Sequence, residues 1–124
     1  MNKLILLFFI VIIFSFYNCN FSKPMQEKKQ GIHYFKGWNS YSIPFNPENP
    51  IDSAAIDFNY SYYIGIYEND VLMSFKKMNN GLIVWEDNYE YWENSDILKK
   101  RKMIKEDSSI ITQNFDEKGK ILKD

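Results

Sequence analysis

The side chains with the most obvious capacity for chemistry are acidic and gather in one short stretch of the chain. They are Glu86, Asp87, Glu90, Glu93 and Asp96. Two carboxylates are sufficient for glycoside hydrolysis, in which one acts as the acid and the other as base or nucleophile. The next segment is basic, with Lys99, Lys100, Arg101, Lys102 and Lys105. Opposite charges on neighbouring strands are typical of a solvated, ion-paired sheet face. We therefore expect surface charge here, with Glu86 and Glu90 on one face and Asp87 on the other.

Nucleophilic and metal chemistry have few residues to draw on. The chain has a single histidine, His33, and a single cysteine, Cys19. An activated nucleophile needs a base beside it, and a Cys/His metal centre needs several ligands. His33 lies among aromatic residues, so we expect a structural role for it. The sequence predicts no catalytic residue, no metal site and no cofactor, and therefore a protein that is not an enzyme.

Aromatic side chains in the same region suggest either a core or a binding site. Strand side chains alternate between faces, so Trp85 shares a face with Tyr89 and Tyr91, while Trp92 shares the opposite face with the acidic residues. Large aromatic rings form cores, and exposed ones can stack on sugars. We favour the core, and we keep a short set of weak binding candidates. They are Trp85, Trp92, Glu86 and Glu90.

The first segment of the chain has the pattern of an export signal. Met1, Asn2 and Lys3 precede an unbroken apolar run over residues 4–14, and the chain then becomes polar. A membrane-spanning helix needs roughly 18 apolar residues, whereas the apolar part of a signal peptide has about 7–15. The chain therefore has the layout of a secreted protein.

Cys19 stands where cleavage of this signal would fall. The segment Phe16-Tyr17-Asn18-Cys19 resembles the lipobox of bacterial lipoproteins, although Tyr17 and Asn18 are larger than that pattern prefers. The resemblance implies a lipid on Cys19 and attachment to a membrane of the cell envelope. Asn20 after the cysteine points to the outer membrane if the host is Gram-negative. An uncleaved N-terminal anchor and a soluble secreted product are the alternatives.

Composition limits the mature protein to one small domain. We divide the chain into a signal peptide over residues 1–18, a flexible tether over 19–30 and a folded domain over 31–124. Loss of Lys3 leaves 14 basic and 16 acidic residues, so a net charge of −2 gives no basis for nucleic-acid binding. Cys19 has no partner for a disulfide, and stability must come from an aromatic-rich core.

The folded part reads as an antiparallel β-meander of about five to seven strands. We expect one strand and a loop over residues 31–41, then strands over residues 60–67, 71–78, 82–92, 97–105 and 110–115, with a short partner at 121–122. Asn80-Gly81 supplies the positive φ values of a tight hairpin. The proline-rich segment 43–50 is predicted to be extended but not central in a sheet, and residues 52–56 to form one capped helical turn.

Charge and hydrophobicity predict the register of the hairpin that contains the acidic cluster. A turn centred on Asn94-Ser95 would place Trp85 opposite Ile104 and Tyr91 opposite Leu98. It would also place Asp87 opposite Lys102 and Glu90 opposite Lys99, which gives two favourable charge pairs.

A repeat at 24 residues relates Tyr67, Tyr91 and Phe115. Each is followed by a polar turn and then an apolar pair, Val71-Leu72, Ile97-Leu98 and Ile121-Leu122. Over residues 60–124 this pattern resembles the hairpin repeats of MORN-like proteins and of related repeat antitoxins, although only the third turn keeps the glycine. The resemblance implies stacked hairpins and, for the antitoxins, neutralisation of a toxin.

Together these observations predict an exported, lipid-anchored β-domain that acts by binding or as a component of the cell envelope. Its partners would be the membrane, through the lipid, and another protein or a glycan. The alternative is a toxin-neutralising, immunity-like repeat protein.

Overall fold

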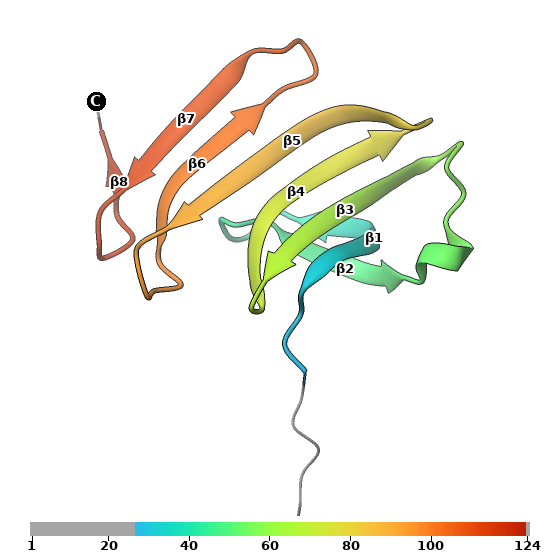
Figure 1. The fold of residues 1–124 in the computed structure, drawn as a ribbon. Coiled ribbons are helices and arrows are strands. Elements are labelled where there is room, and N and C mark those ends of the chain that lie inside the picture. The colour runs from blue at the N-terminus through green and yellow to red at the C-terminus, as the bar shows by residue number, and fades with distance from the viewer. Residues whose placement is uncertain (1–26, 124) are drawn as a thin grey trace, which may run out of the picture.

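The computed structural model describes residues 27–123, which form one antiparallel sheet of eight strands (Figure 1). The strands are β1 (Gly31–Asn39), β2 (Asn46–Ile51), β3 (Ser61–Glu68), β4 (Val71–Asn79), β5 (Leu82–Tyr91), β6 (Leu98–Ile104), β7 (Ile110–Phe115) and β8 (Ile121–Leu122). A 3-10 turn, η1 (Ser53–Ala55), precedes β3. The predicted fold class is confirmed. The predicted number of strands was slightly too low, because the proline-rich segment adds β2 at the sheet edge.

The strands are ordered β2-β1-β3-β4-β5-β6-β7-β8 in the sheet. From β3 onward the order follows the sequence, which is the predicted meander. β2 lies at an edge of the sheet, where it has one neighbouring strand. Pro47 and Pro50, which lack an amide proton, are tolerated there because no second strand needs a donor from them. The connection from β2 to β3 contains the predicted capped turn, in which the Asp52 side chain accepts a hydrogen bond from the Ala54 amide.

The predictions for the signal peptide, for Cys19 and for residues 20–26 concern residues outside those that the structure describes. Within residues 27–123, the structure contains no helix that is long and apolar enough to cross a membrane. Lys29 and Gln30, at the end of the predicted tether, already contact the domain. The Asp70 amide donates to the Lys29 carbonyl at 2.8 Å, and the Asn69 amide donates to Gln30 Oε1 at 2.8 Å.

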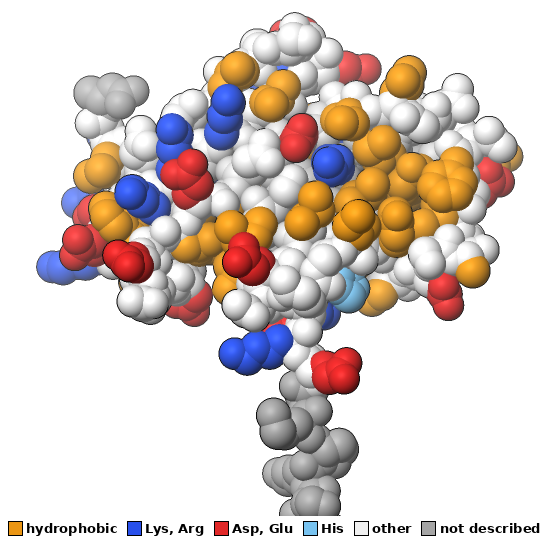
Figure 2. Space-filling view, in the orientation of Figure 1, with side chains coloured by type: hydrophobic (Ala, Val, Ile, Leu, Met, Phe, Trp, Pro, Cys, Tyr) orange, Lys and Arg blue, Asp and Glu red, His pale blue; other side chains and the backbone are white. Residues whose placement is uncertain are grey.

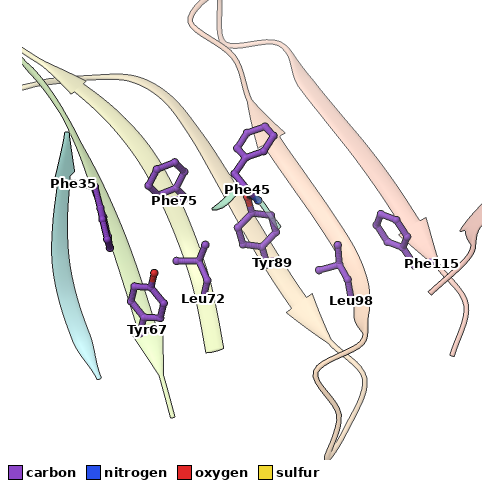
Figure 3. Packing of buried hydrophobic residues seen from close by; sticks show 8 residues of the cluster. All are labelled: Phe35, Phe45, Tyr67, Leu72, Phe75, Tyr89, Leu98 and Phe115. Atoms are coloured by element: carbon purple, nitrogen blue, oxygen red, sulfur yellow. Dashed lines mark hydrogen bonds between the residues drawn. The ribbon is translucent and has the colours of Figure 1, made fainter. Parts of the chain in front are cut away.

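The sheet is strongly curved, and its concave face holds the core (Figure 1, Figure 3). Eight buried side chains form this core: Phe35, Phe45, Tyr67, Leu72, Phe75, Tyr89, Leu98 and Phe115. Phe45 comes from the β1–β2 connection, which folds over the concave face and brings its ring against Trp38 and Trp85. The opposite, convex face is the one seen in Figure 2. One curved layer therefore encloses its own core.

Local irregularities allow the sheet to curve. The pairing shifts by one residue at Ile66/Tyr67, at Lys77/Met78 and at Glu90/Tyr91. Such bulges bend a strand and increase its twist. Gly65 contributes in a different way, because a Cβ there would lie 3.1 Å from the Phe35 and Tyr67 rings. The absent side chain lets the two rings close over β3.

The third of these bulges corrects the predicted β5–β6 register. Tyr91 is opposite Leu98, as predicted, but Lys99 is an extra residue and Glu90 is opposite Lys100. Asp87 is consequently opposite Met103 instead of Lys102, and Ile104 is opposite Glu86 instead of Trp85. The predictions for Trp85, Asp87 and Glu90 were wrong because an uninterrupted ladder was assumed.

The 24-residue spacing marks equivalent positions in three hairpins. Tyr67 is opposite Leu72, Tyr91 opposite Leu98, and Phe115 opposite Ile121. In each hairpin an aromatic side chain at the end of one strand faces an aliphatic side chain at the start of the next. The resemblance to MORN-like and antitoxin repeats stays a prediction.

The Asn80-Gly81 hairpin yields a first testable prediction. Asn80 has φ 50° and Gly81 has φ 75°, as a tight two-residue turn requires. Gly81→Val should lower the free energy of unfolding by about 1–2 kcal/mol, because a β-branched residue is strained at positive φ. Urea denaturation of the full chain measures the change. Gly81→Asn, which tolerates this conformation, should cost less, and an equal loss in both variants would contradict the turn geometry.

Candidate functional site

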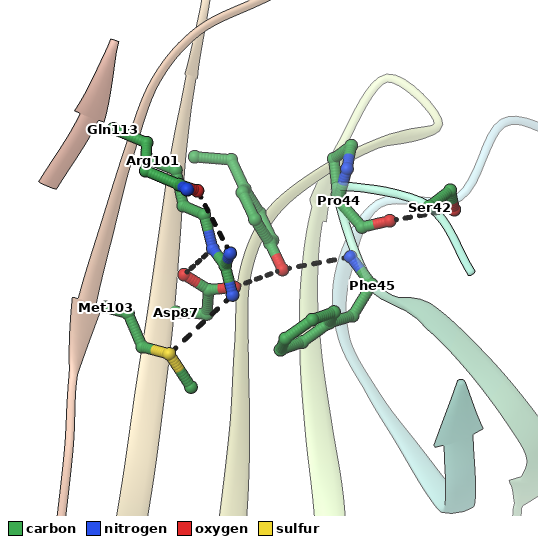
Figure 4. Close-up of polar contacts among 8 residues, drawn as sticks. Ser42, Pro44, Phe45, Asp87, Arg101, Met103 and Gln113 are labelled. Atoms are coloured by element: carbon green, nitrogen blue, oxygen red, sulfur yellow. Dashed lines mark hydrogen bonds and ion pairs between the residues drawn. The ribbon is translucent and has the colours of Figure 1, made fainter. Parts of the chain in front are cut away.

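The most concentrated polar arrangement in the described residues is buried on the concave face, around Asp87 of β5 (Figure 4). The Asp87 side chain is completely buried. Arg101 Nε of β6 donates to both Asp87 carboxylate oxygens, at 2.9 and 2.8 Å. The Tyr89 hydroxyl donates to Asp87 Oδ2 at 2.8 Å, and the Phe45 amide donates to the Tyr89 hydroxyl oxygen at 3.1 Å. A continuous chain of hydrogen bonds thus runs from β6 to the β1–β2 connection.

The guanidinium group extends this network to β7. Arg101 Nη1 donates to Gln113 Oε1 at 3.2 Å, and Nη2 lies 3.6 Å from the Met103 sulfur. Its Cζ atom lies 4.7 Å from the centre of the Phe45 ring, which is a cation–π contact. We call Phe45, Asp87, Tyr89, Arg101 and Gln113 the buried network. It joins three strands to the segment that covers the core.

Strand geometry explains how these residues meet. Asp87 and Tyr89 are two positions apart in β5 and therefore point to the same face. The extra residue Lys99 moves Arg101 opposite Tyr89 and onto the concave face. We predicted Asp87 and Arg101 to be surface charges, and that prediction was wrong: both side chains are buried and paired with each other. The bulge reverses the face on which the only arginine of the chain lies.

The buried network is arranged to hold structure together rather than to react. Both Asp87 oxygens accept hydrogen bonds, and the Tyr89 oxygen both donates and accepts. Burial, reinforced by the negative charge of Asp87, raises the pKa of the Tyr89 hydroxyl well above its usual value. The phenol therefore remains protonated and keeps donating to the carboxylate. The polar atoms of the buried network thus form hydrogen bonds with one another.

The four weak binding candidates do not form one site. Trp85 is on the concave face and packs against the core rings of Phe75 and Trp38. Glu86 is half-buried on the convex face, with its carboxylate 3.9 Å from Lys76 Nζ. Glu90 is exposed on the same convex face, opposite Lys100. The sequence placed Trp85, Glu86 and Glu90 on the correct faces, and Trp85 is therefore separated from the two acidic residues.

Trp92 lies at the end of the β5–β6 hairpin and joins it to the last one. Its indole nitrogen donates to the Asp116 carbonyl at 3.0 Å, and Lys99 Nζ lies 5.0 Å from its ring centre. His33 is similarly engaged, with Nε2 3.1 Å from the Gln30 carbonyl oxygen and its ring edge-on to Tyr67 at 5.3 Å. These contacts fit structural roles for both side chains.

The convex face carries a depression that the network does not reach. It has a volume of about 330 Å³ and is lined by Asn88, Glu90, Lys100 and Lys102. We call these four residues the charged stripe, since they lie opposite one another on β5 and β6. Within residues 27–123, no group of three or more His, Cys, Asp or Glu side chains is placed to hold a metal ion.

Residues 27–124 match the profile of a protein family described as a family of unknown function, DUF6156. The chain matches no curated protein and no solved structure.

The buried ion pair should dominate the stability of the domain. Asp87→Asn or Arg101→Met should each lower the free energy of unfolding by about 3–5 kcal/mol, because either change leaves a buried polar group without its partner. Chemical denaturation of the full chain measures the loss. The exposed Glu90→Gln is the matched control and should cost less than about 1 kcal/mol.

If these variants are too unstable to fold, Tyr89→Phe offers a milder test of the same network. It removes the hydrogen bonds to Asp87 and to the Phe45 amide, and should cost about 1–3 kcal/mol. Costs for Asp87→Asn and Tyr89→Phe no larger than that of Glu90→Gln would show that the network does not hold the fold.

Alkaline pH should unfold the domain. Burial raises the pKa of Tyr67, Tyr89 and Tyr91 above the ordinary tyrosine value of 10.0. Above pH 10.0 the unfolded chain therefore releases protons that the folded chain retains, so the free energy of unfolding falls as the pH rises. Denaturation at several pH values, followed by tyrosinate absorbance, measures this slope. Tyr91→Phe should make it shallower than the exposed control Tyr60→Phe does, and equal slopes would contradict the assignment.

Proposed function

Since the chain belongs to the DUF6156 family, a family of unknown function, we propose its function from its own sequence and geometry. The protein is an exported β-domain, held at a cell-envelope membrane by a lipid on Cys19, that acts by binding. In a Gram-negative host the membrane is the outer membrane. The domain is not an enzyme.

Support for the anchor comes from the order of segments along the chain. The apolar run and the lipobox-like residues 16–19 precede a polar segment, and the match to the family begins only at residue 27. The first hydrogen bonds of the domain are made by Lys29 and Gln30. The contacts of Lys29 and Gln30 leave residues 20–28 as the length of chain available for a tether between Cys19 and the domain.

The observation that favours binding is the distribution of polar groups between the two faces. On the concave face, Asp87 and Tyr89 are saturated by internal hydrogen bonds and covered by Phe45. On the convex face, the charged stripe remains exposed to solvent in part and forms a depression. Interaction with another molecule is therefore the use to which the open face is best suited.

The charged stripe fits a protein or glycan partner. It presents carboxylate, amide and ammonium groups within one depression, which provides donors and acceptors together. Mixed charges of this kind give orientation and specificity in protein recognition. The net charge of −2 in the mature chain argues against nucleic acid as the partner.

A second candidate, toxin neutralisation, is favoured by the three equivalent hairpins. The aromatic–aliphatic pairs Tyr67–Leu72, Tyr91–Leu98 and Phe115–Ile121 recur at the ends of successive hairpins. This is the kind of arrangement that the resemblance to repeat antitoxins implies. A toxin gene adjacent to this one would favour this candidate.

Cys19→Ser tests the anchor. Without a thiol the protein cannot receive the lipid, so labelling by a fatty-acid probe should disappear and the protein should move from the membrane to the soluble fraction. Ser22→Ala is a matched control and should remain lipidated and membrane-bound. A Cys19→Ser protein that still sediments with membranes after an alkaline wash would show that the apolar run itself is the anchor.

A further inference from the structure

The convex face also carries an apolar patch, separate from the charged stripe. Figure 2 shows hydrophobic side chains gathered over the β1–β3 half of this face, with more charged side chains toward β6–β8. We define the convex patch by six residues: Ile32, Tyr34, Phe58, Tyr62, Ile64 and Ile66. Ile32 is 60% exposed and Phe58 is 56% exposed. Large apolar side chains grouped in this way mark an interaction surface.

The convex patch is a built surface. Ile32 is opposite Ile66, and Tyr34 is opposite Ile64, so β1 and β3 contribute cross-strand pairs. The buried Tyr62 ring lies 6.2 Å from Tyr34 and 5.6 Å from Phe58. Phe58, from the connection that precedes β3, is thereby held at the surface by packing from below.

The position of the patch in the chain indicates what covers it. Ile32 follows Gln30 by two residues, and Gln30 and Lys29 fix the chain entry to the β3–β4 turn. Eleven residues separate Cys19 from β1, and at full extension they span at most about 40 Å. A lipid on Cys19 therefore keeps the patch within reach of the bilayer at all times. This proximity raises the effective concentration of the patch at the membrane surface.

We propose that the convex patch rests on the lipid bilayer to which Cys19 is anchored. This inference depends on the proposed lipid anchor. Aromatic rings favour the membrane–water interface, and the isoleucines gain by leaving water. Lys36, exposed on the same face of β1, lies beside the patch. Its alkyl chain can lie along the apolar surface while the ammonium group reaches the headgroups.

Docking in this way orients the domain. The charged stripe lies on β5 and β6, separated from β1 and β3 by β4 in the curved sheet. Contact through the β1–β3 half therefore leaves the stripe free to meet a partner. The lipid supplies attachment, and the patch fixes which side of the sheet faces away from the membrane.

The test uses the full lipidated chain with a single added thiol. Asn59→Cys places a thiol beside Phe58 without altering the patch, and Ile121→Cys places one on β8, at the opposite edge of the sheet, where Ile121 is 48% exposed. The lipid occupies Cys19, the only native cysteine, so the added cysteine carries the only free thiol and is spin-labelled. Accessibility to a water-soluble paramagnetic reagent is then compared in detergent and in phosphatidylethanolamine–phosphatidylglycerol vesicles. We expect the label at position 59 to become protected in vesicles and the label at position 121 to stay accessible.

Serine at both Ile32 and Phe58 should reverse this protection without releasing the protein from the vesicles. The docked-to-free ratio should fall by at least about tenfold, which corresponds to about 1.4 kcal/mol of lost contact. Ile110→Ser with Leu122→Ser is the matched control, since both residues are exposed and lie on β7 and β8, at the other end of the sheet from β1 and β3. The control should leave the protection unchanged.

Several results would overturn the proposal. Equal accessibility of the two labels on vesicles would show that the patch does not meet lipid. Protection in intact cells but not on vesicles would assign the patch to a protein partner, and protection that grows with protein density on the vesicles would assign it to a second copy. Failure of the anchor is distinguishable from all of these, because the unaltered protein would then carry no fatty-acid label on Cys19.

Discussion

The fold depends on a buried ion pair that fastens the cover of a single-layer core. A lone sheet has no second layer against which to bury its apolar face, so this chain curves the sheet and lays Phe45 over the concave side. Asp87 and Arg101 lie under that cover, and the Tyr89 hydroxyl links the carboxylate to the Phe45 amide. Charges taken out of water are tolerated only when they are paired and fully hydrogen-bonded. The same hydrogen-bonded residues therefore cover the core and complete the hydrogen bonding of the ion pair.

Curvature and the ion pair share a cause in the β5–β6 bulge. The extra residue Lys99 bends β6 and also turns Arg101 toward Asp87 and Gln113. Without that residue, strand alternation would direct the arginine to the convex face. The Ile66/Tyr67 bulge and the bare Cα of Gly65 do equivalent work on β3 and β4, where they let Leu72 and the Phe35 and Tyr67 rings pack closely. The irregular positions of the sheet are the ones that make a core possible.

The division of the sheet into a buried face and an open face has a functional consequence. The polar groups of the concave face bond to one another, so only the convex face presents groups to another molecule. The convex face divides into a charged stripe on β5–β6 and an apolar patch on β1–β3. These two surfaces of different chemistry on one sheet fit the proposed contacts with a bilayer on one half and with a binding partner on the other.

The sequence by itself determined the features that depend on a few adjacent residues. The positive φ values at Asn80-Gly81, the capped turn after Asp52, the extended conformation of the proline-rich segment and the faces of Trp85, Glu86 and Glu90 follow from local backbone preferences and strand alternation. The register beyond Glu90, the burial of Arg101 and the network that joins it to Phe45 were decided only by the tertiary structure. A bulge leaves one residue unpaired in the ladder, which is locally unfavourable. It is favoured by contacts between segments up to 44 residues apart in the sequence. Its position therefore depends on packing that a short stretch of sequence does not contain.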